Sequence, residues 1–145
     1  MGSKNFAGIG TWKLVAYTSD VDGNITYPLG KDAAGQLMYD TKGYMAAQIV
    51  DVNRPKFATE DYRKLTPEET GAAFKGYVAY FGTYEIDEGK EAVIHHVANS
   101  LLPNWAGTDL IRLYEFNGNR MTLRSEPMVR GSHIIVLTLV WEKIK

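Results

Sequence analysis

Gly10-Thr11-Trp12-Lys13-Leu14-Val15 opens the first strand-like run of the chain, and similar runs rich in Val, Ile, Tyr, Thr and Trp follow it at short spacing. These residue types favour strands. Turn signals separate the runs; Asn117-Gly118 is typical of a tight hairpin, because a type I′ turn needs positive φ at both central residues. The pattern predicts eight strands, at residues 9–18, 35–40, 43–50, 76–87, 91–100, 109–117, 119–125 and 133–144.

Strands of this number, joined by tight turns, are expected to form one all-β domain, an antiparallel barrel within residues 1–145. Closure into a barrel removes the unpaired edges that an open sheet exposes. The length of 145 residues fits one domain with one sizeable core. Residues 1–5 are expected to lie outside that core, as a disordered or cloning-derived segment.

The composition argues against several classes of function. The chain has 16 Lys and Arg against 17 Asp and Glu, and this balance disfavours nucleic acid and anionic membranes as partners. Because there is no cysteine, disulfides and thiolate catalysis are excluded, and a reducing, cytoplasmic location is expected. The sequence shows no apolar signal-peptide core, and no run approaches the roughly 18 apolar residues of a membrane-spanning helix.

The segment 66–75 departs from the strand pattern. Thr66-Pro67-Glu68-Glu69 predicts a helix start, with Thr as N-cap, Pro at the first helical position and Glu completing a capping box. This short helix lies in the one long connection, 51–75, which is expected to cross a mouth of the barrel. There it would act either as a functional lid or as a plug that protects the core.

Several stretches, in order along the chain, resemble the bacterial and fungal lipocalin-like domain proteins of the calycin group. Besides the opening Gly10–Val15 stretch they are Tyr27-Pro28-Leu29-Gly30, Gly35-Gln36-Leu37-Met38-Tyr39, Gly43-Tyr44-Met45, Gly82-Thr83-Tyr84, His95-His96-Val97, Pro103-Asn104-Trp105 with Gly107-Thr108, Arg112, and Val140-Trp141-Glu142-Lys143. The resemblance implies a lipocalin-like barrel whose closed end is plugged by Trp12. Related calycin barrels bind small hydrophobic molecules or act as cyclases, isomerases and hydratases.

His95 and His96 are the candidate catalytic residues. Neighbours on a strand point to opposite faces, so one is expected in the lumen and the two cannot easily share a metal. With three histidines and no cysteine, no metal and no other cofactor is expected. The inward histidine is a candidate general acid or base, because its ordinary pKa lies near neutrality. The alternative is a structural histidine, hydrogen-bonded to backbone or to a tyrosine. Alternation does not decide which of the two faces inward.

Arg112 lies in the apolar run Leu110-Ile111-Arg112-Leu113-Tyr114. An arginine in such a strand is rarely buried without a partner. It is either an anchor for an anion or carbonyl of a ligand, or a structural cation that stacks on Trp12 and closes the barrel.

Phenolic and amide side chains recur on the predicted strands, and Trp105 lies in a connection beside a glycine, where it would anchor the loop or gate the mouth. Tyr combines an apolar body with a polar tip, which suits a pocket for an oxygenated aromatic or polyketide-like molecule. The alternative is that these are ordinary strand residues. The predicted ligand-binding residues are Tyr39, Tyr44, Gln48, Tyr84, Asn99, Trp105, Arg112 and Tyr114.

Two functions therefore remain open. The first is a carrier or sensor, a monomer or homodimer, that binds a small hydrophobic or aromatic molecule. The second is a cofactor-free isomerase, cyclase or hydro-lyase of natural-product metabolism, in which the inward histidine moves a proton. A third, plainer possibility is a barrel filled by its own side chains.

Overall fold

Strands make up most of the described chain. The computed structural model describes residues 6–144, and the expectation for residues 1–5 lies outside this range. The strands are β1 (Gly10–Val21), β2 (Asn24–Thr26), β3 (Ala34–Tyr39), β4 (Tyr44–Val50), β5 (Tyr77–Asp87), β6 (Ala92–Ser100), β7 (Asp109–Asn117), β8 (Arg120–Ser125), β9 (Met128–Arg130) and β10 (His133–Lys143). The helical elements are η1 (Tyr62–Lys64), α1 (Pro67–Lys75) and η2 (Pro103–Trp105).

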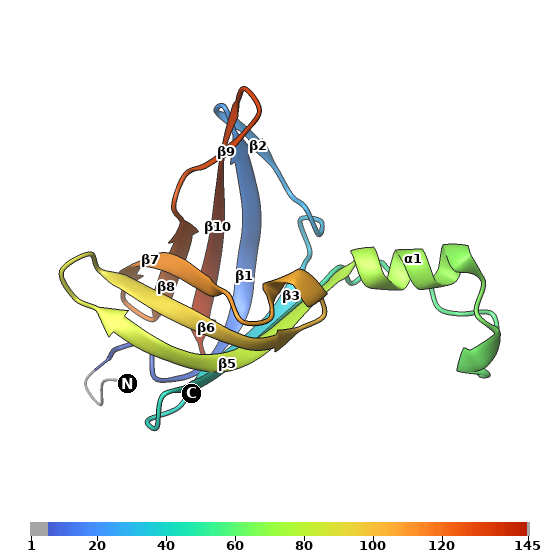
Figure 1. Ribbon diagram of the computed structural model, residues 1–145, viewed down its shortest axis with the longest axis horizontal. Helices are drawn as coiled ribbons and strands as arrows, with labels where there is room; N and C mark the ends of the chain where they lie inside the picture. Colours follow the sequence, from blue (N-terminus) through green and yellow to red (C-terminus); the bar gives the residue numbers. More distant parts are fainter. Residues whose placement is uncertain (1–5, 145) are drawn as a thin grey trace.

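The strands form an antiparallel sheet that closes on itself (Figure 1). Around the ring the order is β1-β3-β4-β5-β6-β7-β8-β10, and β10 pairs with β1 from Trp12↔Lys143 to Val21↔Ile135. The predicted eight-stranded antiparallel barrel is confirmed. The short strands β2 and β9 pair with one end of β1 and of β10, respectively. They were not predicted, because three residues carry too little alternation to identify a strand.

Aromatic side chains fill the end of the barrel where the chain enters. Trp12 is 2% exposed, and its Nε1 donates to the Gly8 carbonyl oxygen at 2.8 Å. Phe6 packs beside it, with its ring centroid 5.5–6.0 Å from four others: Tyr39, Tyr84, Tyr114 and Phe116. The cation over the Trp12 indole is Lys143, whose Nζ lies 5.1 Å from the ring centroid. Lys143, and not Arg112, is therefore the cation that stacks on Trp12.

A bulge interrupts the alternation of β1. Its register with β10 shifts between Leu14 and Ala16. Because a bulge adds one residue, the lumen-facing side chains beyond it belong to the other parity. Tyr17, which pairs with Leu139, therefore packs against the core as Trp12 and Leu14 do before the bulge.

A second bulge lies in β6. Gly82 of β5 pairs with Val97, whereas the adjacent Phe81 pairs with Asn99. A Cβ at position 82 would overlap the carbonyl oxygen of His96, so the glycine permits this close approach of the two strands. The bulge turns Asn99 to the outer face, beside exposed Phe81.

The connection from β4 to β5 forms an arm that leaves the barrel (Figure 1). At the start of α1, Thr66 Oγ1 accepts from Glu69 N at 3.1 Å and Glu69 Oε1 accepts from Thr66 N at 2.9 Å, which is the predicted capping box. No residue of α1 is buried, and the helix points away from the barrel. The expectation that this connection crosses the mouth as a lid or plug is therefore wrong.

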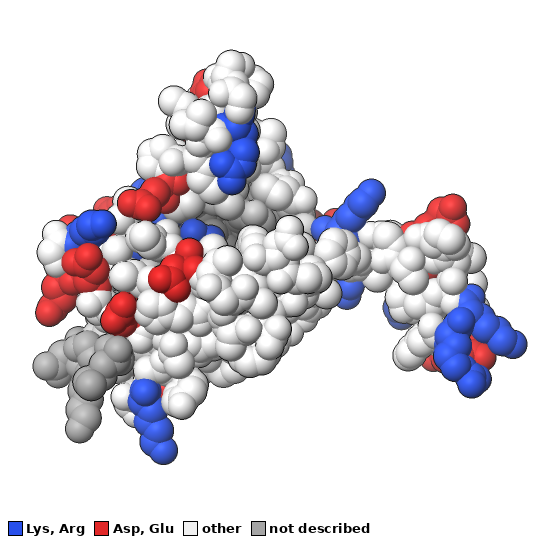
Figure 2. All heavy atoms as spheres, in the orientation of Figure 1, with Lys and Arg blue, Asp and Glu red and all other residues white. Residues whose placement is uncertain are grey.

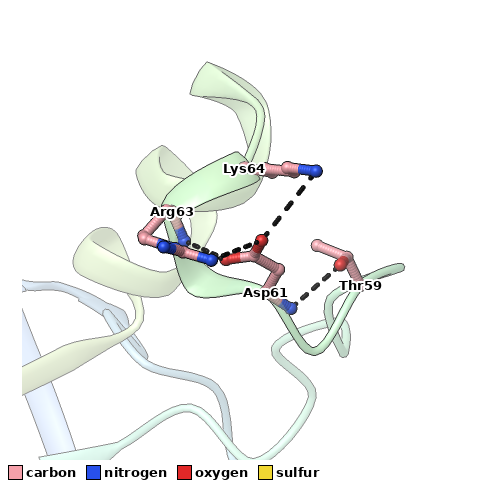
Figure 3. Close-up of polar contacts among 4 residues, drawn as sticks. All are labelled: Thr59, Asp61, Arg63 and Lys64. Atoms are coloured by element: carbon pink, nitrogen blue, oxygen red, sulfur yellow. Dashed lines mark hydrogen bonds and ion pairs between the residues drawn. The ribbon is translucent and has the colours of Figure 1, made fainter.

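Local polar contacts order the tip of this arm (Figure 3). The Asp61 backbone N donates to Thr59 Oγ1 at 2.9 Å, and Asp61 Oδ1 accepts from Arg63 Nε at 3.0 Å. The contact with Arg63 lowers the pKa of Asp61, and Lys64 Nζ lies 4.0 Å from the same carboxylate. These contacts stay within residues 59–64. Among residues 6–144, no helix has the length and apolar character needed to cross a bilayer.

Candidate functional site

The barrel is filled at one end and accessible at the other. At the end closed by Trp12, large inward side chains are no more than 2% exposed: Leu37, Tyr39, Tyr84, Met121 and Trp141. Towards the opposite end, the inward side chains are only partly buried: Tyr17, Tyr80, Leu110, Arg112 and Leu137. Figure 2 shows a hollow between the raised ends of β1 and β10 and the β6–η2 segment. The side chains of this half of the lumen are therefore reached by solvent from this end.

His95 lies in the lumen at the boundary between the two halves. Strand alternation places it inward from β6, where it is 1% exposed. Its Nε2 lies 2.6 Å from Tyr39 Oη, and its Nδ1 lies 2.8 Å from Tyr80 Oη. Burial, and then the positive charges of Arg112 and His96, lower the pKa of His95 to about 3. The imidazole is therefore neutral at physiological pH.

The direction of these two hydrogen bonds follows from the burial of Tyr39. A neutral imidazole donates from one nitrogen and accepts at the other. Tyr39 is 1% exposed, and within the described chain His95 is the one hydrogen-bond partner of its hydroxyl. Its buried proton is satisfied when it is donated to Nε2. Nδ1 then donates to Tyr80 Oη, and the hydroxyl proton of Tyr80 is free to be donated into the lumen. This tautomer is assigned from the network.

Arg112 points into the open half of the lumen. It pairs across the sheet with Val93 and Ser125, which are 0% and 3% exposed. Its Nη1 donates a hydrogen bond to the carbonyl oxygen of the adjacent Ile111, at 3.3 Å. Among residues 6–144, no carboxylate lies within ion-pair distance of its guanidinium. Within this range, Arg112 is thus a partly buried cation without a counter-ion.

The charge of Arg112 reaches side chains from four other strands. Burial raises the pKa of Tyr17, Tyr39 and Tyr80, and in each case the nearby Arg112 charge opposes that rise. Arg112 also helps to lower the pKa of His95. His95 contacts Tyr39 and Tyr80 directly, and Tyr17 and Arg112 also face the lumen, so these five side chains are treated as one cluster.

Trp105 stands at the rim of this cluster. η2 brings its ring to 5.6 Å from the Tyr80 ring, edge to face, and the side chain is partly exposed. An aromatic at this position supplies a flat apolar wall at the mouth of the lumen. Of the predicted site residues, the structure brings together Tyr39, His95, Trp105 and Arg112.

His96 lies on the outer face of the barrel. Its Nδ1 is 2.7 Å from Asp109 Oδ1 and its Nε2 is 3.1 Å from Glu85 Oε1, and the bond to Asp109 raises the pKa of His96 most. The carboxylates sit on opposite ring nitrogens, so one metal ion cannot bind all three side chains. No cluster of His, Asp or Glu within residues 6–144 has the geometry of a metal site.

Five more predicted site residues lie away from the cluster. Tyr44 is 57% exposed on the outer face of β4. Gln48 also points outward, where it accepts a hydrogen bond from Tyr77 Oη at 2.5 Å. Asn99, turned outward by the β6 bulge, lines with Gln48 a groove of about 260 Å³ on the outer surface. Tyr84 and Tyr114 belong to the aromatic cluster at the closed end, and Tyr84 Oη donates to the Asp40 carbonyl oxygen at 2.6 Å.

Sequence reasoning did not identify Tyr17 as part of the site. Strict alternation from Trp12 predicts that Ala16 and Thr18 face inward, and only the bulge between Leu14 and Ala16 reverses this. Nothing in the local sequence marks that bulge. Tyr80 is likewise absent from the predicted site residues, and its pairing with the inward histidine became apparent only from the structure.

Comparisons with known proteins agree with the fold. The family model described as the lipocalin-like domain matches residues 9–144, so the chain belongs to the lipocalin-like domain family. The chain is also similar to the 4'-hydroxy-3'-methoxypropiophenone carrier protein ppsC of Aspergillus oryzae. The two are 28% identical over 107 residues, which cover 69% of this chain and 96% of that protein. No solved structure matches at a significant level. The family resemblance found in the sequence is confirmed.

Proposed function

We propose that this protein is a binding protein for a small, oxygenated aromatic molecule, which it holds in the open half of the barrel lumen. The observation that carries the proposal is the Arg112 guanidinium, which has no carboxylate partner within residues 6–144 and points into the same half of the lumen as the Tyr80 hydroxyl. An unpaired charge within a barrel is costly unless something compensates it. A ligand oxygen between these two donors supplies that compensation, while Trp105 and Tyr17 provide flat apolar walls.

The relative from Aspergillus oryzae supports the chemical class of the ligand. Its name describes a carrier of a methoxylated hydroxyphenyl ketone, a flat molecule with an apolar ring and acceptor oxygens. Such a molecule matches a lumen in which tyrosine and tryptophan rings surround two or three hydrogen-bond donors.

The geometry favours binding over acid–base catalysis. Both nitrogens of His95 are engaged by tyrosine hydroxyls, and its pKa of about 3 makes it a weak base at neutral pH. In the proposed carrier, His95 is a positioning residue that directs the Tyr80 hydroxyl proton towards the ligand.

Isothermal titration calorimetry with 4'-hydroxy-3'-methoxypropiophenone tests this function. Arg112→Gln is expected to weaken binding by about 10-fold or more, the cost of losing a charge-assisted hydrogen bond. The matched control is Arg124→Gln, which removes the same charge from the exposed outer face of the neighbouring strand β8. Equal losses in the two variants, or turnover of the ligand by the wild type, would argue against a lumen carrier.

A further inference from the structure

The charge around Arg112 is unbalanced at neutral pH. The titratable groups that its charge reaches are Tyr17 of β1, Tyr39 of β3, Tyr80 of β5 and His95 of β6. Burial raises the pKa of the three phenols, and the imidazole is neutral above about pH 3, so none of them is an anion. Within the described chain, the cluster therefore carries one positive charge and no negative one.

Arg112 and Tyr80 both present protons to a ligand there. The guanidinium has five N–H groups and no acceptor. Tyr80 Oη already accepts from His95 Nδ1, which leaves its own proton for the ligand. A neutral phenol placed between Arg112 and Tyr80 would accept from both, but its own proton would need a further acceptor such as the Tyr17 hydroxyl, and the guanidinium charge would stay unbalanced. A phenolate accepts from both and leaves nothing unpaired.

We propose that the lumen binds its aromatic ligand as a phenolate, with the charged oxygen between the Arg112 guanidinium and the Tyr80 hydroxyl. The inference rests on the proposed function, since it assigns the ionisation state of a ligand in the same site. The ligand class is a phenol with a carbonyl group para to the hydroxyl. The ring then delocalises the phenolate charge onto the carbonyl oxygen, and ionisation occurs much nearer neutral pH than for an ordinary phenol. The cargo in the relative's name has this arrangement of hydroxyl and ketone.

Absorbance titration of a bound probe tests the inference. The probe is 4'-hydroxy-3'-methoxyacetophenone, whose phenolate absorbs at longer wavelength than its phenol. With protein in excess, the pKa of the bound probe is expected to fall by about 1–3 units below that of the free probe, as for an acid placed beside a guanidinium. Arg112→Gln is expected to abolish this fall. Arg124→Gln, which removes an outward charge paired with Glu115 at 3.2 Å, is expected to preserve it.

A second probe separates this inference from the proposed function. The ether 3',4'-dimethoxyacetophenone has the same ring and ketone but no ionisable hydroxyl, and it is expected to bind about 10-fold more weakly or worse at pH 8. If the ether binds as tightly as the phenol, or if the bound phenol ionises at the pKa of the free phenol, the ligand is held neutral. The inference then fails while lumen binding stands. If neither probe binds, the proposed function fails and this inference fails with it.

Tyr80→Phe provides an independent variant should Arg112→Gln not fold. It keeps the ring that packs on Trp105 and removes only the donor hydroxyl. It is expected to reduce the fall in the probe's pKa without abolishing it, because Arg112 remains. If the bound probe had the same pKa in Tyr80→Phe as in the wild type, the placement of its oxygen beside Tyr80 would be contradicted.

Discussion

Removing the Tyr39 hydroxyl tests the hydrogen-bond chain from Tyr39 through His95 to Tyr80. Tyr39→Phe keeps the ring that packs edge to face on Phe6 and Tyr84, with centroids 5.5 and 4.8 Å away. It leaves Nε2 of His95, a residue only 1% exposed, without its donor. An unsatisfied buried polar atom costs about 1–3 kcal/mol, so the free energy of unfolding is expected to fall by that amount.

The measurement is urea unfolding, with Tyr44→Phe as the matched control. Tyr44 also lies on a barrel strand but is 57% exposed on the outer face, so losing its hydroxyl is expected to change stability by less than about 0.5 kcal/mol. Nitrogen-15 chemical shifts of His95 in the wild type are expected to show a protonated Nδ1 and an unprotonated Nε2. Equal stability losses in the two variants, or a proton on Nε2, would refute the assigned direction of the chain.

Three further predictions concern the fold. Trp12→Ala is expected to destabilise the barrel by about 3–5 kcal/mol in the same urea assay, because the indole is 2% exposed; a loss below about 1 kcal/mol would mean that it is not a plug. Gly82→Ala is expected to destabilise more than Gly71→Ala, where a new Cβ meets no atom within 4 Å; equal melting temperatures would contradict the close approach at the β6 bulge. As pH falls from 6.5 towards the His95 pKa of about 3, the unfolded chain takes up a proton that the folded His95 does not, so stability is expected to fall by about 1.4 kcal/mol per pH unit from this group. The raised pKa of His96 has the opposite effect, because the stability that protonated His96 contributes is lost as pH rises through its folded pKa. The His95 effect is therefore measured in a His96→Gln background, by pH-dependent unfolding with and without His95→Gln. The double variant is expected to lack the loss of stability at acid pH that His95 causes.

Local patterns predicted the ring of strands well. Turn residues and period-two runs identify strands independently of their neighbours, and the capping residues of α1 act within one helical turn. The three-residue strands β2 and β9 are defined by their pairing with β1 and β10, and their own sequences carry no comparable signal. The direction of the arm was also beyond prediction, because a cap sets where a helix begins and not where it points.

The site was predicted only in part because it depends on register. Alternation shows that His95 and His96 face opposite ways, but both parities of β6 are largely apolar, so the sequence does not say which one faces inward. Asn99 shares the parity of His95 and yet lies outside, because the bulge intervenes. Tyr17 enters the site through the corresponding bulge in β1. Both irregularities appear only in the pairing of one strand with another, so neither can be identified from the residues of a single strand.

A crystal structure of the complex with 4'-hydroxy-3'-methoxypropiophenone would test the central claim most directly. We expect the ligand ring in the open half of the lumen, with its hydroxyl oxygen within about 3 Å of the Arg112 guanidinium and Tyr80 Oη. The ligand in the outer groove beside Phe81 and Asn99, or in the lumen with no oxygen near Arg112, would contradict it.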